Sequence, residues 1–509
     1  MAIDKGLTRT ERFLGRLAQR SFLSLWAHSN CYRDIAKELC DLLVVCHNVV
    51  IIFSDKEVRF NDSIPLDRAW ARWYNRAVLK SFPQLKRAMN WVKNHPDRIF
   101  QNPQCTERLS LFERVEEALE IHLVAVANGA SKSCIRHFEG GSGSLLVSPD
   151  EDPDDPEPFC VGKLGGPEMF VHVFDEAHLH IILQELDTIR DFSDYLKARE
   201  RLISNDNLFS AAGEEDLLAV YLKDVNEKGE HDFVWETGRR LESNQKLVIE
   251  EGSYRNYQKA PPYRRKKKAD RQSYLWDRLV EKFAGNLSAG TLAPVPEGLG
   301  KDGREEGAEL GLRYMALERR VQRRAHSAAI EGAFEYLENN KGNRFFRAMI
   351  PENPEQGDTG FCVLLVKREI TPEGTSFADY RAFRASNLAA YTENLLERNR
   401  HLKRVVGIAT EGSRRGPMSE DLIYHEPPEW TEEAIASAKE SAKGFDIFTG
   451  AMRQTRYSTE EYPETDSGLK EGFAPIPYIF IERPNSPEPQ LPGNRRQRRA
   501  AAARRKKHK

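Results

Sequence analysis

The stretch that decides the fold is Glu38-Leu39-Cys40-Asp41-Leu42-Leu43-Val44-Val45, followed closely by Val49-Val50-Ile51-Ile52-Phe53-Ser54-Asp55-Lys56. Two short apolar runs joined through His47-Asn48 predict a tight β-hairpin with buried strands. The first run carries Asp41 near its entrance, and the second ends on Lys56. A carboxylate and an ammonium group at the ends of such apolar strands indicate a chemical site at that end of the hairpin.

Composition limits the class of protein. The chain has 509 residues, 40% of them apolar and 30% charged, which predicts a soluble globular protein of about three domains. The longest nearly unbroken apolar run, residues 42–53, is too short to span a bilayer, so we expect no membrane anchor. The first five residues lack the apolar core of a secretory signal. Seven scattered cysteines without a Cys-x-x-Cys pair indicate reduced thiols and a cytoplasmic location, and argue against a zinc ribbon.

The periodicity of the chain predicts an α/β fold. In the first domain, residues 1–138, apolar side chains recur at helical spacing over about residues 8–30, and Thr8 and Glu11 form a capping-box pattern. The hairpin follows, then two helical stretches and a strand at His122–Asn128. A helix, a hairpin, further helices and a strand together predict an α/β domain.

Shifts in composition divide the rest of the chain into five regions. These are a linker or long loop (139–160), a middle α/β region (161–253), a basic region that contains a linker (254–304), a C-terminal α/β domain (305–485) and a basic disordered tail (486–509). Within the C-terminal domain, a strand at 362–366, a helix at 377–399 and a strand at 405–409 are typical of a parallel crossover, that is, a βαβ unit.

Charged residues around the hairpin predict a metal-dependent reaction on phosphate. Glu11 lies on the first helix, Asp41 opens the first strand, and Lys56 closes the second. Hard carboxylate oxygens bind Mg²⁺ (or Mn²⁺), the cation stabilises charge that develops on phosphate, and a lysine positions or helps deprotonate the attacking water. We therefore interpret Asp41, Lys56 and Glu11 as candidate catalytic residues.

In these residues the segment of about 8–60 resembles the PD-(D/E)XK nuclease superfamily, especially its restriction-type and nuclease-related-domain branches. In that family an E…D…ExK series spans a helix and a hairpin. The resemblance implies a restriction-endonuclease-like domain that hydrolyses phosphodiester bonds of DNA, or of RNA, with Mg²⁺ or Mn²⁺. By analogy with bacterial members it also implies a role in defence against foreign nucleic acid.

One position departs from the family pattern. The acid that should stand two residues before the lysine falls on Ser54, and the nearest carboxylate, Asp55, is out of phase by one residue. Side chains alternate along a regular strand, so Ser54 and Lys56 face one side and Asp55 faces the other. Three explanations are open: a bulge rotates Asp55 inward, Glu38 provides the missing ligand, or metal binding has been lost. The candidate metal ligands are therefore Glu11, Glu38, Asp41 and Asp55.

Simpler roles fit several of these residues, and a second function is open. Glu11 is equally well explained as a helix-capping residue. Basic residues of two clusters, the tail at 495–509 and Arg264-Arg265-Lys266-Lys267-Lys268, suit nucleic acid, probably DNA, with a contribution that weakens as salt rises. The histidines at 172, 178 and 180 contain a His-x-His pair, but we interpret them as polar residues around a strand because no separated ligand is evident. The alternative to a nuclease is a nonenzymatic nucleic-acid-binding or protein-binding factor on a degenerate nuclease fold.

Overall fold

The structure is a computed structural model. It describes residues 9–109, 115, 117–152, 156–166, 168–234, 240–242, 245–292, 304–340, 342–354, 357–412, 419–448, 460–463 and 478–482. These residues form two compact units, unit 1 (residues 1–268 and 460–509) and unit 2 (residues 269–459). The boundary between them falls within one long helix, α9 (Pro261–Ser288).

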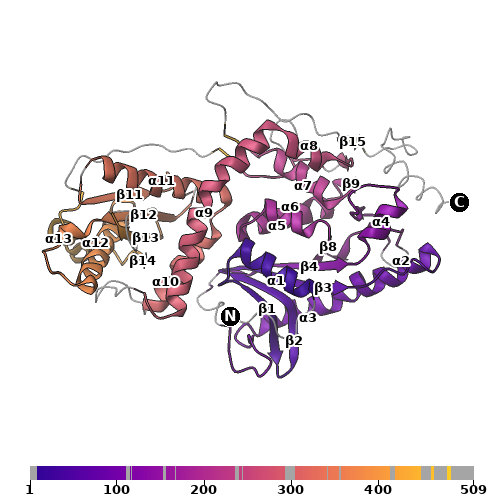
Figure 1. The fold of residues 1–509 in the computed structure, drawn as a ribbon, viewed down its shortest axis with the longest axis horizontal. Helices are drawn as coiled ribbons and strands as arrows, with labels where there is room; N and C mark the ends of the chain where they lie inside the picture. Colours follow the sequence, from indigo (N-terminus) through magenta and orange to yellow (C-terminus); the bar gives the residue numbers. More distant parts are fainter. Residues whose placement is uncertain are drawn as a thin grey trace. The chain divides into compact units, whose positions relative to one another are not determined.

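Unit 1 contains the predicted hairpin, which belongs to a six-stranded sheet in the order β1-β2-β3-β4-β8-β7 (Figure 1). The hairpin strands are β2 (Lys37–Cys46) and β3 (Val49–Glu57), which pair antiparallel. Every residue from Leu42 to Phe53 is buried except Asn48 in the turn, so the prediction of a buried hairpin is confirmed. The apolar residues of both strands form the centre of the core.

The predicted first helix is shorter than expected. Helix α1 spans Arg9–Phe22. The end of the predicted helical stretch belongs instead to a strand, β1 (Ala27–Asp34), which pairs antiparallel with β2. Only Ala27 and Cys31 of this strand are buried. An edge strand with so few buried positions lacks the apolar alternation by which a strand is recognised in a sequence.

The sheet continues through parallel strands beyond β3. The helices α2 (Leu66–Tyr74) and α3 (Ser81–Asn94), joined by a π-helix at Asn75–Leu79, precede β4 (Glu120–Asn128), which pairs parallel with β3. Beside β4 lies β8 (Met169–Asp175), also parallel, and β7 (Leu164–Gly166) pairs antiparallel at the edge. Strand β8, from the predicted middle region, therefore shares a sheet with the predicted first domain.

Helices cover both faces of this sheet. The Phe53 ring of β3 stacks on Phe192 of α6 (Ile189–Ser204), and Phe192 also packs against Phe22 of α1. The next residue, Ser54, hydrogen-bonds Gln84 of α3. Because successive strand residues point to opposite faces, α1 and α6 lie on one face of β3 and α3 lies on the other.

A second sheet of unit 1 has the order β15-β10-β9-β5-β6. Its strands are β5 (Leu146–Val147), β6 (Cys160–Val161), β9 (Leu208–Ala211), β10 (Gln245–Ile249) and β15 (Tyr478–Glu482). Four further helices of unit 1 are α4 (Ser131–His137), α5 (Leu179–Glu185), α7 (Glu214–Lys223) and α8 (Ser253–Lys259). Strand β5 and the first residue of β6 come from the segment predicted as a linker or long loop, residues 139–160.

Unit 2 is built on a four-stranded sheet, β11-β12-β13-β14. Its strands are β11 (Arg344–Met349), β12 (Thr359–Val366), β13 (Arg404–Glu411) and β14 (Glu420–His425). Its helices, besides its part of α9, are α10 (Arg304–Leu317), α11 (Arg320–Asn339), a 3₁₀ turn at Arg368–Ile370, α12 (Phe377–Arg398) and α13 (Glu432–Gly444). Strands β12 and β13 are parallel and joined through α12, which confirms the predicted crossover.

The architecture is therefore mixed α/β in both units. Among the residues that the structure describes, no helix is both long and apolar enough to cross a membrane. The predicted basic tail, residues 486–509, lies outside the described residues.

Candidate functional site at the end of the hairpin

The candidate site lies where β2 separates from β3. Regular pairing between the two strands ends at Leu42 and Phe53, whereas β3 continues to pair with β4 as far as Glu57. Beyond this point the backbone N–H of Asp55 donates to the Asp41 carboxylate, with N to Oδ2 2.5 Å. Asp41 thus takes the place of a backbone carbonyl and holds the ends of the separating strands together.

Lys56 joins this junction from the same side as Asp41. Its Nζ lies 3.7 Å from Oδ2 of Asp41, which is only 5% exposed, while the lysine side chain is 30% exposed. Ser54 faces α3, where its hydroxyl donates to Oε1 of Gln84 at 3.2 Å. The two predicted catalytic residues of the hairpin, Asp41 and Lys56, are therefore in contact, and the Ser54 side chain hydrogen-bonds Asp41 as well as Gln84.

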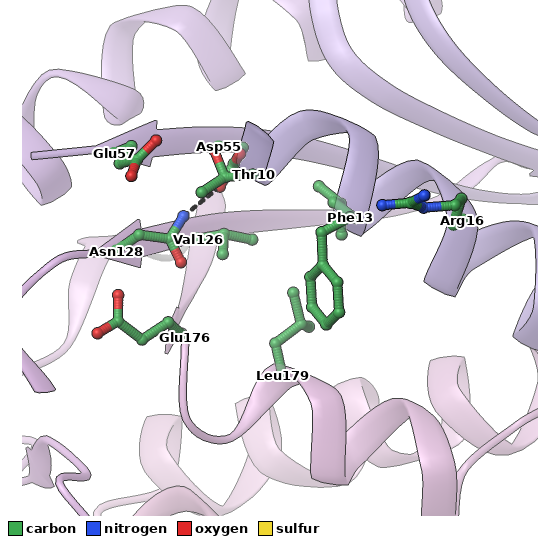
Figure 2. Close-up of a pocket in the computed structure, with 10 residues that line it drawn as sticks. Thr10, Phe13, Arg16, Asp55, Glu57, Val126, Asn128, Glu176 and Leu179 are labelled. Carbon is green, nitrogen blue, oxygen red and sulfur yellow. Dashed lines mark hydrogen bonds between the residues drawn. The ribbon is translucent and has the colours of Figure 1, made fainter. Parts of the chain in front are cut away.

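Asp55 points to the opposite face, toward α1 (Figure 2). Its Oδ1 accepts from Nδ2 of Asn128 at 2.5 Å, and the Thr10 side chain also hydrogen-bonds the carboxylate. Pairing of β3 with β4 runs from Val49 to Glu57 without a shift in register. No bulge in this ladder turns Asp55 toward Lys56, so the first of the three explanations for Ser54 does not hold in this structure.

The carboxyl groups around the junction repel one another. Glu38 is exposed at its residue surface, but partial desolvation of its carboxyl group, with the neighbouring charges of Asp41 and Glu11, raises its pKa to about 7. Burial also raises the pKa of Asp55 to about 6, with Asp41 and Glu11 adding to the effect. The pKa of Asp41 is raised by burial too, although Lys56 opposes the shift. Glu11 on α1 therefore acts electrostatically on all three, so the four predicted ligands belong to one charged cluster.

A cavity of about 360 Å³ adjoins this cluster on the α1 side. Three acidic residues from two parts of the chain gather around it: Asp55 and Glu57 of β3, and Glu176 after β8 (Figure 2). Glu176 accepts from the backbone N–H of Ser131 at 3.3 Å, and burial raises its pKa. The remaining lining residues are Thr10, Phe13, Leu14, Arg16, Val126, Asn128 and Leu179.

The cluster has the type of donor atom that Mg²⁺ prefers, but no three of its donor atoms lie close to one another. Carboxylate oxygens are the ligands that Mg²⁺ prefers, and Asp55 is a buried carboxylate, although the Thr10 side chain and Asn128 hydrogen-bond it. Among the described residues, however, the one set of three His, Cys, Asp or Glu side chains whose donor atoms lie within 4.8 Å of one another is His122, His172 and Glu200. Glu11, Glu38, Asp41 and Asp55 do not bring three donors that close together.

The basic pentad at 264–268 is largely used inside unit 1. Lys266 is buried and pairs with Glu461 at 2.8 Å, Lys267 pairs with Glu185 at 2.8 Å, and Arg265 donates to the carbonyl oxygen of residue 463 at 2.9 Å. Arg264 and Lys268 are exposed. Only two of the five predicted nucleic-acid-binding side chains are therefore fully presented to solvent by this segment of α9.

The histidines are arranged differently from the His-x-His interpretation. His178 is fully buried between two carboxylates, with Nδ1 2.5 Å from Asp175 and Nε2 2.8 Å from Glu215. The Ser144 hydroxyl lies 3.1 Å from the same ring, but it is fully buried as well and has no access to a substrate. His172 instead lies near His122. His122 was not predicted from the sequence as a candidate ligand. The available signal was that this histidine stands in a second apolar strand.

No protein-family model, no curated protein and no solved structure matches this chain. The residues of the cluster therefore carry the functional argument by themselves.

Proposed function

We propose that unit 1 is a metal-dependent nuclease whose site is the carboxylate cluster at the end of the hairpin, with DNA as the first substrate to test. The observation that carries this proposal is the contact between Asp41 and Lys56 at the point where β2 and β3 separate. The raised pKa values of Glu38 and Asp55 support it, because crowded carboxyl groups are typical of sites that bind a cation.

Each residue has a definite task in this proposal. Asp41, helped by Glu38 or Glu11, would hold Mg²⁺ or Mn²⁺, which would supply positive charge to a phosphate oxygen and acidify a water molecule; Asp55 points to the other face and is not assigned to this ion. The Lys56 amine donates hydrogen bonds to the attacking water or to a phosphate oxygen, and Asp41 holds the amine in position. Glu38, with a pKa of about 7, is suited to accept a proton at neutral pH.

A nonenzymatic binding factor is the second candidate, and specific observations favour it. Ser54 stands where the resemblance requires an acid, and Asp55 points away from the face that carries Lys56. The four carboxylates do not offer three close donor atoms. In this second reading the hairpin domain binds nucleic acid or a protein without cleaving a phosphodiester bond.

The deciding experiment compares cleavage and binding in the same proteins. Wild type, Asp41→Asn and Lys56→Ala are incubated with DNA and with RNA in Mg²⁺, Mn²⁺ and EDTA, and binding is followed by fluorescence anisotropy. Asparagine keeps an oxygen that can accept from the Asp55 N–H, so this variant removes charge with little structural change. The exposed Asp97→Asn is the matched control.

A nuclease loses at least a hundredfold in metal-dependent cleavage in both site variants and keeps its binding, while Asp97→Asn behaves as wild type. Equal cleavage by Asp41→Asn and wild type contradicts the proposal. Binding without cleavage in every metal tested, by wild type itself, establishes the binding factor instead.

A further inference from the structure

We propose that His122, His172 and Glu200 bind a divalent transition-metal ion, Zn²⁺, inside unit 1. The three side chains come from β4, β8 and α6, and their donor atoms lie within 4.8 Å of one another. This site is separate from the carboxylate cluster at the end of the hairpin and does not depend on the nuclease proposal.

Strand register and helix packing bring the three residues together. Val124 of β4 is opposite His172 of β8, so His122, two residues earlier on β4, points to the same face of the sheet. Helix α6 packs on this face, where Phe192 contacts Phe174. Glu200 lies about two turns beyond Phe192 on the same side of the helix, which directs it toward the two rings.

Both histidine rings leave one nitrogen without a partner. His122 is 4% exposed and His172 is 1% exposed. Nδ1 of His122 and Nε2 of His172 are buried and have no hydrogen-bond partner among the described residues. Buried polar atoms are rarely left in this state, because losing hydration without a replacement bond is costly. A bound cation would satisfy both nitrogens at once.

The other side of His122 is already arranged as in a metal site. Its Nε2 lies 2.8 Å from Oε1 of Glu120, and Glu120 is held in turn by Lys197 at 2.5 Å. A carboxylate only accepts hydrogen bonds, so Nε2 carries the ring proton and Nδ1 presents its lone pair. A carboxylate behind a histidine ligand fixes the orientation of the ring and makes it more basic.

His172 needs one tautomeric change. Its Nδ1 lies 3.4 Å from Nη1 of Arg199, a long contact, whereas Glu214 holds the same guanidinium at 2.8 and 3.0 Å. To hold an ion through Nε2, the ring would move its proton from Nε2 to Nδ1, so that Nε2 could offer its lone pair. Arg199 would then give up the long contact and keep Glu214, and the ring would release no proton.

The donor set favours a transition-metal ion such as Zn²⁺ over Mg²⁺. Two imidazole nitrogens and one carboxylate oxygen are typical of Zn²⁺ sites, whereas Mg²⁺ prefers oxygen donors throughout. Three protein ligands leave a fourth tetrahedral position for water. Glu200 is only partly buried, so ions and water can reach the site from its side.

The test measures metal uptake by the full chain. The protein is stripped with chelator and titrated with Zn²⁺ by calorimetry and with Co²⁺ by visible absorption, in wild type, His172→Ala and Glu200→Gln. We expect one equivalent of Zn²⁺ in wild type and at least a tenfold weaker affinity in each variant. The exposed His95→Ala is the control and keeps the wild-type affinity.

Circular dichroism identifies a variant that fails to fold. If His172→Ala unfolds, Glu200→Gln still decides the question, because a partly exposed position on a helix tolerates an isosteric change. A folded, stripped wild type that takes up neither Zn²⁺ nor Co²⁺ overturns the proposal. Unchanged stoichiometry and affinity in Glu200→Gln and in a folded His172→Ala overturn it as well.

Discussion

Replacing Lys266 by methionine tests whether the basic pentad is structural. Lys266 is 5% exposed, and its Nζ lies 2.8 Å from Glu461, which also contacts Nε2 of His231 at 3.1 Å. Burial alone would raise the pKa of Glu461, yet Lys266 and His231 hold it well below its usual range. The Lys266→Met substitution removes the ammonium group and leaves a buried carboxylate beside His231.

The size of the effect follows from that arrangement. Breaking a buried ion pair from one side costs roughly 3–5 kcal/mol in proteins. Here His231 stays beside Glu461 and the methionine retains most of the aliphatic packing, so we expect a loss of about 2–3 kcal/mol at pH 8. A lowered carboxyl pKa contributes stability above its unfolded value of about 4.3, and this stability is lost as the pH falls. The difference between variant and wild type therefore shrinks toward pH 4.

Urea unfolding of the full chain, followed by tryptophan fluorescence, measures the change. The neighbours Arg264 and Lys268 are exposed, and their alanine variants should stay within about 0.5 kcal/mol of wild type. The DNA affinity of the same variants is measured as a function of salt concentration. Two results together would refute this reasoning: unchanged stability of Lys266→Met, and a slope of log affinity against log salt concentration that is smaller by about one unit. They would show that Lys266 contacts a DNA phosphate.

Three further outcomes follow from buried or crowded charges. Glu38→Gln should stabilise the metal-free protein by about 1 kcal/mol at pH 8, after allowance for solvent screening, and have no effect at pH 4. The reason is that a carboxyl group with a raised pKa destabilises the folded state as the pH rises through that pKa. Thermal unfolding of both proteins at the two pH values checks this. Burial lowers the pKa of His425 to about 4, so unit 2 should lose up to about 3 kcal/mol as the pH falls from 6.5 to 4, and a His425→Gln variant with the same pH dependence would exclude this histidine as the cause. Asp421→Asn should destabilise unit 2 by about 3 kcal/mol, because Arg384 and Arg381 donate to its two oxygens at 2.6 and 2.7 Å; urea midpoints equal to wild type would show that this ion pair contributes nothing.

Local apolar pattern predicted the elements that bury both faces. The hairpin at residues 42–53, the helix at 377–398 and the strands beside it have strong periodicity, so their type and nearly their bounds followed from sequence. Strand β1 did not, because it lies at the edge and buries few side chains. The pairing of β8 with β4 joins segments far apart in the chain, and no local signal specifies such a partner.

The candidate site was predictable only as far as the hairpin extends. The spacing between Asp41 and Lys56 across two paired strands brought them to one end, and strand alternation predicted that Asp55 faces away from Lys56. The structural use of Lys266 depends on Glu461, which lies in another part of the chain. The closeness of His122 to Glu200 depends on how α6 crosses the sheet, which composition and spacing do not encode.

The position of β8 beside β4 also governs how the chain can be shortened for study. A fragment that stops at residue 138 retains β4 and loses the strand that occupies its outer edge. That edge then offers a row of unpaired backbone N–H and C=O groups along an apolar strand, which is a template for intermolecular pairing. Recombinant pieces of the hairpin domain should therefore extend past Asp175, so that the parallel ladder is complete before the chain ends.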